Sequence, residues 1–112
     1  MIRIDAVFDR AGLLRSCRIS GHAGAGKKGY DIVCAAVSVL SRTMVRTLEK
    51  RKGIAVESAA PGRGLLNMDI KYEAEGQDFL SAAGAFFMEG LTSICEEYPA
   101  YCTMNIRVEE KE

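Results

Sequence analysis

The sequence predicts an α+β domain, a two-layer sandwich in which two helices pack on a mainly antiparallel sheet. Three observations predict this fold. Strand-like and helix-like segments follow one another in the order ββαββαβ, neighbouring strand segments are joined by short turns, and each helical segment has one apolar stripe. The 112 residues contain no internal linker or low-complexity stretch, so we expect a single domain over residues 1–112.

Five segments have the pattern of strands. Residues 2–9 alternate apolar and polar side chains, and residues 13–20 do so again after a turn, which predicts an antiparallel hairpin. Residues 54–59 and 64–73 flank a short turn that contains proline and glycine, which predicts a second hairpin. The last strand is predicted at residues 101–108, ahead of a charged tail.

Two segments have helical periodicity. Asp31 is a favourable N-cap, so we expect the first helix to run from about residue 32 to 50. The second helix is expected at about residues 77–98, since Pro99 cannot continue it. Apolar residues recur in both at the spacing that predicts one buried face. In the first helix the buried face is expected to consist of Val33, Ala36, Val37, Leu40, Met44 and Leu48.

A glycine-rich segment, residues 21–31, precedes the first helix. It holds four glycines within nine residues, and glycine loses the most backbone entropy on ordering, so we expect a mobile loop. The stretch from Gly21 to Lys27 matches most of a phosphate-binding P-loop. That motif needs Ser or Thr at the next position, where this chain has Lys28, and four residues separate Lys27 from the predicted helix. Nucleotide binding is therefore not favoured.

Cys34 is the candidate nucleophile. With Asp31 as N-cap, Cys34 is the third helical residue, beside unpaired N–H groups and the positive end of the helix dipole. Such a position favours a thiolate, and the same N–H groups suit an oxyanion. On a helical wheel Cys34 lies about 90° from the centre of the apolar stripe. It shares that flank with Ser38 and Ser41, so we expect it to face a cleft.

His22 is the candidate general base. It is the only histidine, and it lies twelve residues before Cys34 at the start of the glycine-rich segment. A loop of this length can return to the helix, so His22 can take the thiol proton and later donate it to a leaving amine. Asp31 has two open roles, because a carboxylate that caps the helix is not also available to orient His22 or bind substrate.

Each of these residues also has a plain structural interpretation. A cysteine in an intracellular helix is commonly a small buried hydrophobe, and a single loop histidine is commonly solvated. Their joint position around a glycine loop and a helix start adds weight to an enzymatic interpretation, and the structural interpretation stays open beside it. The remaining cysteines lack such a setting and are interpreted as packing residues: Cys17, Cys95 and Cys102.

Composition argues against several other classes of protein. Fifteen basic residues balance fifteen acidic ones, so no net field favours nucleic acid or a lipid surface. No apolar run approaches the roughly 20 residues that cross a bilayer, and no signal peptide is evident. We therefore expect a cytoplasmic protein with reduced thiols. With one histidine and no C-x-x-C pair, we expect neither a metal nor any other cofactor.

The segment around these residues resembles a known family. Gly21-His22-Ala23, then Gly29, then Asp31-Ile32-Val33-Cys34-Ala35-Ala36 with Ser38, is similar to the bacterial ribosomal-processing cysteine protease family, Prp. The length and the order of elements are similar too. The resemblance implies a cytoplasmic endopeptidase that removes the N-terminal extension of large-subunit ribosomal protein twenty-seven, which ribosome assembly needs.

The same resemblance implies roles for individual residues. Cys34 would be the nucleophile and His22 the general base, while Gly21, Asp31 and Ser38 would support the site or contact substrate. It also implies a homodimer whose glycine loop orders over bound peptide. Two alternatives stay open: a non-catalytic ribosome-associated binding module that uses the basic end of the first helix, and a redox-sensing thiol protein.

Overall fold

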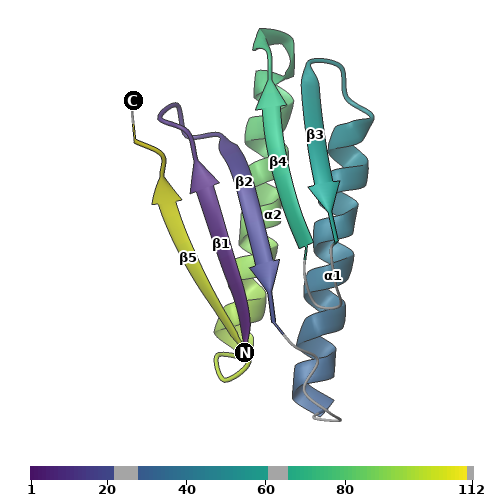
Figure 1. Ribbon diagram of the computed structural model, residues 1–112, viewed down its shortest axis with the longest axis vertical. Helices are drawn as coiled ribbons and strands as arrows, with labels where there is room; N and C mark the ends of the chain where they lie inside the picture. The colour runs from purple at the N-terminus through teal and green to yellow at the C-terminus, as the bar shows by residue number, and fades with distance from the viewer. Residues whose placement is uncertain (22–27, 61–65, 111–112) are drawn as a thin grey trace.

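The chain forms one five-stranded sheet with two long helices (Figure 1). The structure is a computed structural model and describes residues 1–21, 28–60 and 66–110, with the backbone alone at 28–30. Its elements are β1 (Ile2–Phe8), β2 (Leu14–Ser20), α1 (Lys28–Glu49), β3 (Ile54–Ala59), β4 (Leu66–Tyr72), a 3₁₀ turn (Ala74–Gly76), α2 (Gln77–Glu97) and β5 (Cys102–Val108).

The strand order across the sheet is β3-β4-β2-β1-β5. β1 pairs antiparallel with β2, opposing Ile4 to Ile19 and Ala6 to Cys17, and parallel with the edge strand β5. β4 pairs antiparallel with both β2 and β3. The predicted α+β fold, its ββαββαβ order and its mainly antiparallel sheet are therefore confirmed.

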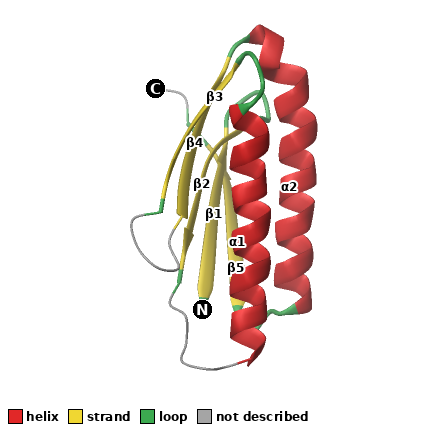
Figure 2. Ribbon diagram, turned by 90° about the vertical axis from the view of Figure 1, so that its right-hand side faces the viewer, coloured by secondary structure: helices red, strands yellow, loops and turns green. Residues whose placement is uncertain are grey.

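Both helices cover the same face of the sheet, which leaves the opposite face uncovered (Figure 2). The alternation in β1 follows from this arrangement, because Ile2, Ile4 and Ala6 are buried whereas Arg3 and Asp5 are exposed. Each fully buried aliphatic or aromatic side chain contributes about 1.5–3 kcal/mol. The largest fully buried side chains are Phe87, Ile4, Leu14, Leu48, Met68, Ile70, Leu80 and Leu91.

The buried face of α1 is close to the predicted stripe. Val33, Val37, Met44 and Leu48 are buried, and Ser41 joins them as a fully buried polar residue. The remaining two members of the predicted stripe, Ala36 and Leu40, are half-buried. Val45, which the predicted stripe did not include, is buried as well. Counted from Val33, the buried residues therefore lie at positions i, i+4, i+8, i+11, i+12 and i+15, as expected of a helix packed on a sheet.

The predicted start of this helix was wrong. α1 begins at Lys28, so Asp31 is its fourth residue and not its N-cap, and Cys34 is its seventh residue and not its third. Once later turns are anchored on the sheet, each added residue gains a hydrogen bond. That gain outweighs the cost of about 1 kcal/mol for Gly29 in the added turn.

The glycine-rich segment is correspondingly shorter than predicted. Residues 28–31 are helical, and residues 22–27 lie outside the described part of the chain. Because α1 directly follows Lys27, the argument against a P-loop from a four-residue gap was wrong. The argument from Lys28 is unaffected, since a lysine has no hydroxyl to hold magnesium.

Candidate active site

A pocket of about 260 Å³ lies beside the N-terminal half of α1. This volume is close to the lower end of the range of small-ligand pockets, about 300–1,000 Å³. One wall is a row of side chains on α1, at spacings of four and three residues: Cys34, Ser38 and Ser41. The opposite wall is apolar and comes from the strands: Ile2, Ile19 and Leu66.

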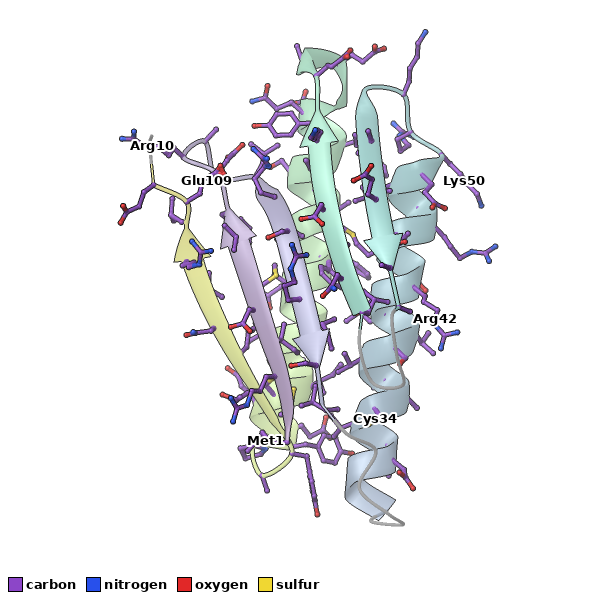
Figure 3. The ribbon with its side chains drawn as sticks, in the orientation of Figure 1. Met1, Arg10, Cys34, Arg42, Lys50 and Glu109 are labelled. Carbon is purple, nitrogen blue, oxygen red and sulfur yellow. The ribbon has the colours of Figure 1, made fainter. Side chains whose placement is uncertain are left out.

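Cys34 lies on α1 near its N-terminal end (Figure 3). It is half-buried and lines the pocket, so it faces a cleft as predicted. Its surroundings differ from the prediction in one respect. Cys34 lies six residues beyond Lys28, about 9 Å along the helix axis, so it is not in the first turn. The dipole effect falls off within that turn. The unpaired N–H groups of the helix start are therefore not the oxyanion donors that the sequence predicted.

Gly21 brings the end of β2 into the same pocket as Cys34. A Cβ at Gly21 would lie 2.9 Å from the Cα of Ile2 and 3.0 Å from the carbonyl oxygen of Met1, so only glycine fits against the first strand. The candidate base, His22, is the next residue in the chain and lies outside the described residues. The pocket therefore contains the thiol and the point from which the histidine-bearing segment departs.

Asp31 is exposed in the first turn of α1. It does not line the pocket, whereas Ser38 does. Because Asp31 is inside the helix, its carboxylate does not serve as the N-cap. An acidic side chain in the first turn also interacts favourably with the helix dipole. The structure therefore removes the helix-cap role that the sequence left open for Asp31, and its roles in orienting His22 or contacting substrate stay predictions.

Two other cysteines are buried packing residues, as predicted. Cys17 is 0% exposed, and burial, followed by the charge of Asp5, raises its pKa to about 12. The pKa of Cys102 is also raised to about 12. Burial is the largest cause, and the contact with Cys95 and the nearby Cys34 raise the pKa further. Both therefore remain neutral thiols near pH 7, in contrast to what a nucleophile requires.

Two features of this region were missed by sequence reasoning. The Sγ atoms of Cys95 and Cys102 lie 2.7 Å apart, a contact between α2 and β5 that helical and strand periodicity cannot reveal. The Ser41 Oγ is completely buried in the pocket wall, and no described residue pairs with it. The sequence does place Ser41 on the same flank of the helix as Cys34, but that pattern does not by itself indicate that Ser41 is buried.

The described residues contain no group of three or more His, Cys, Asp and Glu side chains placed to hold a metal ion. Within the same residues, neither helix is long and apolar enough to span a membrane.

Comparison with known proteins identifies relatives over nearly the whole chain. Residues 1–103 match the family model described as cysteine protease Prp. A search of curated proteins finds no match. Among solved structures, SMU.848 from Streptococcus mutans is 32% identical, with a TM-score of 0.83 over 97% of this chain and 96% of that one.

Two further matches are structures of the essential ribosomal processing protease Prp from S. aureus. The complex with a substrate peptide is 21% identical, with a TM-score of 0.80, and covers 95% of this chain and 99% of that one. The complex with a covalently linked product peptide is 22% identical, with a TM-score of 0.78 and the same coverage. At these identities the two structures show the shared fold.

Proposed function

Because the chain belongs to the cysteine protease Prp family, we propose that it is a cysteine endopeptidase that removes the N-terminal extension of a ribosomal protein. The proposed substrate is large-subunit ribosomal protein twenty-seven, and the proposed site is the pocket beside α1. The S. aureus relative of the same fold forms complexes with a substrate peptide and with a covalently linked product peptide. Both complexes support a peptide as the ligand.

One observation carries the assignment of the catalytic pair. Cys34 and Gly21 line the same pocket, and His22 follows Gly21 directly in the chain. Consecutive Cα atoms are 3.8 Å apart, so the histidine is tethered within one residue of the pocket wall. The two cysteines with a strongly raised pKa, Cys17 and Cys102, are poor nucleophiles by comparison.

The proposed reaction uses these two side chains in sequence. His22 accepts the proton of Cys34, and the thiolate attacks the scissile carbonyl carbon to form a tetrahedral oxyanion. The oxyanion collapses to a thioester when His22 donates the proton to the departing amine. Water, deprotonated by His22, then attacks the thioester, and release of the carboxylate product returns the thiol.

The other residues that the family resemblance points to have supporting roles in this proposal. Asp31, which is not used as a helix cap, orients the imidazole of His22. Ser38 lies one helical turn beyond Cys34 in the pocket wall and donates a hydrogen bond to the peptide backbone. The apolar wall opposite, which includes Ile2 and Leu66, accepts apolar side chains that precede the cut.

Mass spectrometry of the substrate's N-terminus tests this proposal. The purified ribosomal protein with its extension is incubated with the wild type, Cys34→Ala, His22→Ala and the control Cys95→Ser. We expect the wild type and the control to release the extension, Cys34→Ala to lose activity by several orders of magnitude, and His22→Ala to lose roughly a hundred- to ten-thousandfold.

The same experiment separates the alternatives. Binding of the ribosomal protein without cleavage by the wild type would favour the non-catalytic module. Cleavage that persists in Cys34→Ala would remove the protease assignment at this residue. A redox sensor would instead form a sulfenic acid or mixed disulfide at Cys34 in dilute peroxide, without cleaving the protein.

We also propose that the enzyme is a cytoplasmic homodimer. Exposed apolar side chains support an interface: Phe86 is 76% exposed and Val39 62% exposed on the outer side of the helices, and Ile106 and Val108 are exposed on the edge strand β5. Sedimentation of the wild type, Phe86→Glu and Ile106→Glu tests this. We expect one substitution to yield monomers and so identify the interface, whereas a monomeric wild type at micromolar concentration contradicts the dimer.

A further inference from the structure

The second half of α1 is basic although the whole chain has no net charge. Residues 42–52 contain five basic side chains and one acidic side chain, whereas the full sequence has fifteen of each. All five basic residues are exposed: Arg42, Arg46, Lys50, Arg51 and Lys52. Neither ion pair among the described residues uses any of them. Positive charge is therefore concentrated on this surface, where it favours a negatively charged partner.

Three of these basic side chains form a stripe along α1. Arg42, Arg46 and Lys50 follow one another at a spacing of four residues, which is about 6 Å of helix axis. On a helical wheel they lie within about 80° of one another, on the side opposite the buried face. Figure 3 shows Arg42 beyond Cys34 along α1, and Lys50 beyond Arg42. The helix dipole accounts for a cation in the last turn, which is Arg46, but not for Arg42 one turn earlier.

The stripe borders an open groove of about 360 Å³ between the end of α1 and the start of α2. This basic groove is lined by Thr43, Arg46, Thr47, Lys50, Arg51 and Phe79. It therefore combines three cations, two hydroxyl groups and one aromatic ring. The cations suit phosphate oxygens, and the hydroxyl groups can donate and accept hydrogen bonds. A positively charged groove with an aromatic side chain is the common arrangement for binding a single nucleic-acid strand.

Arg51 and Phe79 form a flat platform in this groove. The guanidinium carbon of Arg51 lies 3.9 Å from the centre of the Phe79 ring. This cation–π contact restricts the orientation of the planar group. Because Arg51 is exposed, a ligand can reach the side of the guanidinium that is turned away from the ring. Unstacked RNA bases bind on arginine planes in this way, so the groove offers a platform for a base beside a row of cations.

We propose that the basic groove, together with Arg42, binds single-stranded RNA with its phosphates along α1 and one base on Arg51. A single strand fits better than a duplex, because a base must leave its own stack to reach Arg51. RNA fits better than DNA, because the hydroxyl groups of Thr43 and Thr47 can pair with the ribose 2′-hydroxyl. An acidic protein segment would match the charges but would leave the platform unused. The inference goes beyond the proposed function, since it does not require cleavage by Cys34.

The RNA surface adjoins the proposed peptide site. Arg42 lines the pocket that contains Cys34, whereas the basic groove shares no residue with that pocket. A strand that lies on the stripe therefore reaches the rim of the pocket without covering the thiol. Because Arg42 borders the peptide site, substitutions that test RNA binding are better placed at Arg46 and Lys50.

The salt dependence of RNA binding tests the proposal. Fluorescence anisotropy of a labelled uridine oligomer gives the dissociation constant, which we expect to be micromolar for the wild type at low salt. Each of four cations contributes about 0.7 to the slope of log affinity against log salt, so we expect a slope of about −3. Arg46→Gln/Lys50→Gln should halve this slope and weaken binding at least tenfold. The control Arg3→Gln/Lys71→Gln removes the same charge from the uncovered face of the sheet and should bind as the wild type.

Arg51→Lys separates stacking from charge. Lysine keeps the positive charge but has no planar group to stack against a base. We therefore expect an unchanged salt slope and a loss of affinity of about fivefold or more. A DNA oligomer of matching sequence should bind more weakly than the RNA, and polyglutamate of equal charge should bind more weakly still.

Several results would overturn the inference. Equal loss of affinity in the control Arg3→Gln/Lys71→Gln would show that only net charge matters. Polyglutamate that binds as tightly as RNA would assign the groove to an acidic protein, and equal affinity for DNA would remove the preference for RNA. RNA binding that disappears as the protein self-associates at higher concentration would assign the surface to a second copy of the chain. All of these are binding measurements, so they stand or fall separately from cleavage of the ribosomal protein.

Discussion

The backbones of Gly53 and Gly76 are in direct contact. A Cβ on Gly76 would lie 2.5 Å from the carbonyl oxygen of Gly53, and a Cβ on Gly53 would lie 2.6 Å from the amide nitrogen of Gly76. The same carbonyl oxygen accepts a hydrogen bond of 2.8 Å from the N–H of Glu73. The turn after α1 and the turn before α2 are thereby joined at one end of the sheet.

This contact predicts that alanine is destabilising at Gly76, whereas alanine at Gly84, a glycine outside the contact, is expected to be stabilising. Gly76→Ala must displace backbone, so we expect the free energy of unfolding to fall by about 1–3 kcal/mol. Gly84→Ala is the control, because its Cβ would meet only the Cβ of Leu14, at an ordinary 3.8 Å, within a helix. There we expect a gain of about 0.5–1 kcal/mol. Urea unfolding measures both, and a fully stable Gly76→Ala protein contradicts the contact.

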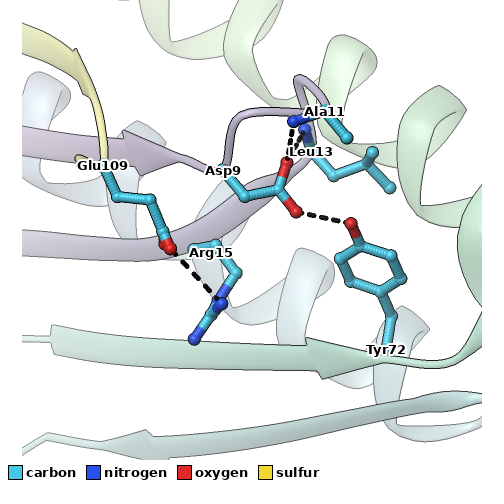
Figure 4. Close-up of polar contacts among 6 residues, drawn as sticks. All are labelled: Asp9, Ala11, Leu13, Arg15, Tyr72 and Glu109. Carbon is cyan, nitrogen blue, oxygen red and sulfur yellow. Dashed lines mark hydrogen bonds and ion pairs between the residues drawn. The ribbon is translucent and has the colours of Figure 1, made fainter. Parts of the chain in front are cut away.

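Asp9 and Tyr72 predict how stability depends on pH (Figure 4). Burial acts to raise the pKa of Asp9, but hydrogen bonds from the Tyr72 hydroxyl and from the N–H groups of Leu13 and Ala11 outweigh it, so the pKa is lowered. The hydrogen bond to Asp9, followed by burial, raises the pKa of Tyr72.

The directions of the two pKa shifts define the pH range in which the contact between Asp9 and Tyr72 stabilises the fold. The lowered pKa of Asp9 gives stability that is present above its unfolded value of about 3.9 and lost as the pH falls further. The raised pKa of Tyr72 gives stability that is present below about pH 10 and lost above it. We expect Tyr72→Phe to be less stable than the wild type mainly between these limits. An equal difference at pH 2 and pH 7, measured by urea unfolding, would refute the linkage.

Gly21→Ala is expected to impair cleavage because it moves the chain that leads to His22. Its Cβ would lie 2.9 Å from the Cα of Ile2, so the end of β2 must shift. A displacement of about 1 Å at a catalytic group costs roughly a hundredfold in rate. Gly12→Ala is the control, since its φ is +91° but nothing lies within 4 Å of the added Cβ. It should lose stability yet keep the kcat of the folded enzyme, and a Gly21→Ala enzyme with full kcat would contradict this role.

Alkylation at pH 8 is expected to distinguish the cysteines. Cys17 is fully buried, and burial and Asp5 raise its pKa to about 12, so iodoacetamide should not label it in the folded protein. Cys34, which lines the pocket, should be labelled first, and a bound peptide should protect it. Mass spectrometry of timed samples measures the rates, with a urea-unfolded sample as the control. Equal native rates at Cys17 and Cys34 would contradict this prediction.

Local patterns predicted the elements well because each depends on neighbouring residues. The alternation of Ile2, Ile4 and Ala6 reports one buried face of a strand, and β3 was predicted with its observed bounds. The start of α1 was not predicted, because its first turn contains Gly29 and forms through cooperativity with turns that pack on the sheet. The position of Cys34 relative to the helix dipole was wrong for the same reason.

Contacts between distant segments could not be predicted from one sequence. The shared flank of Cys34, Ser38 and Ser41 follows from helical spacing, but the apolar wall opposite them depends on how β1, β2 and β4 are ordered in the sheet. Pairing of β1 with β5, which begins at Cys102, likewise places this cysteine against α2. Neither relationship has a local signal.

Met1 and Glu109 lie at opposite ends of the sheet, which Figure 1 shows as the start of β1 and the end of β5. Met1 is at the same end as Cys34, and the carbonyl oxygen of Met1 borders the space that Gly21 must leave empty (Figure 3). An affinity tag fused ahead of Met1 would therefore emerge next to the pocket mouth and compete with peptide. Purification handles and fluorophores belong on the C-terminal side of Glu109, which lies at the opposite end of the sheet from Cys34 (Figure 3).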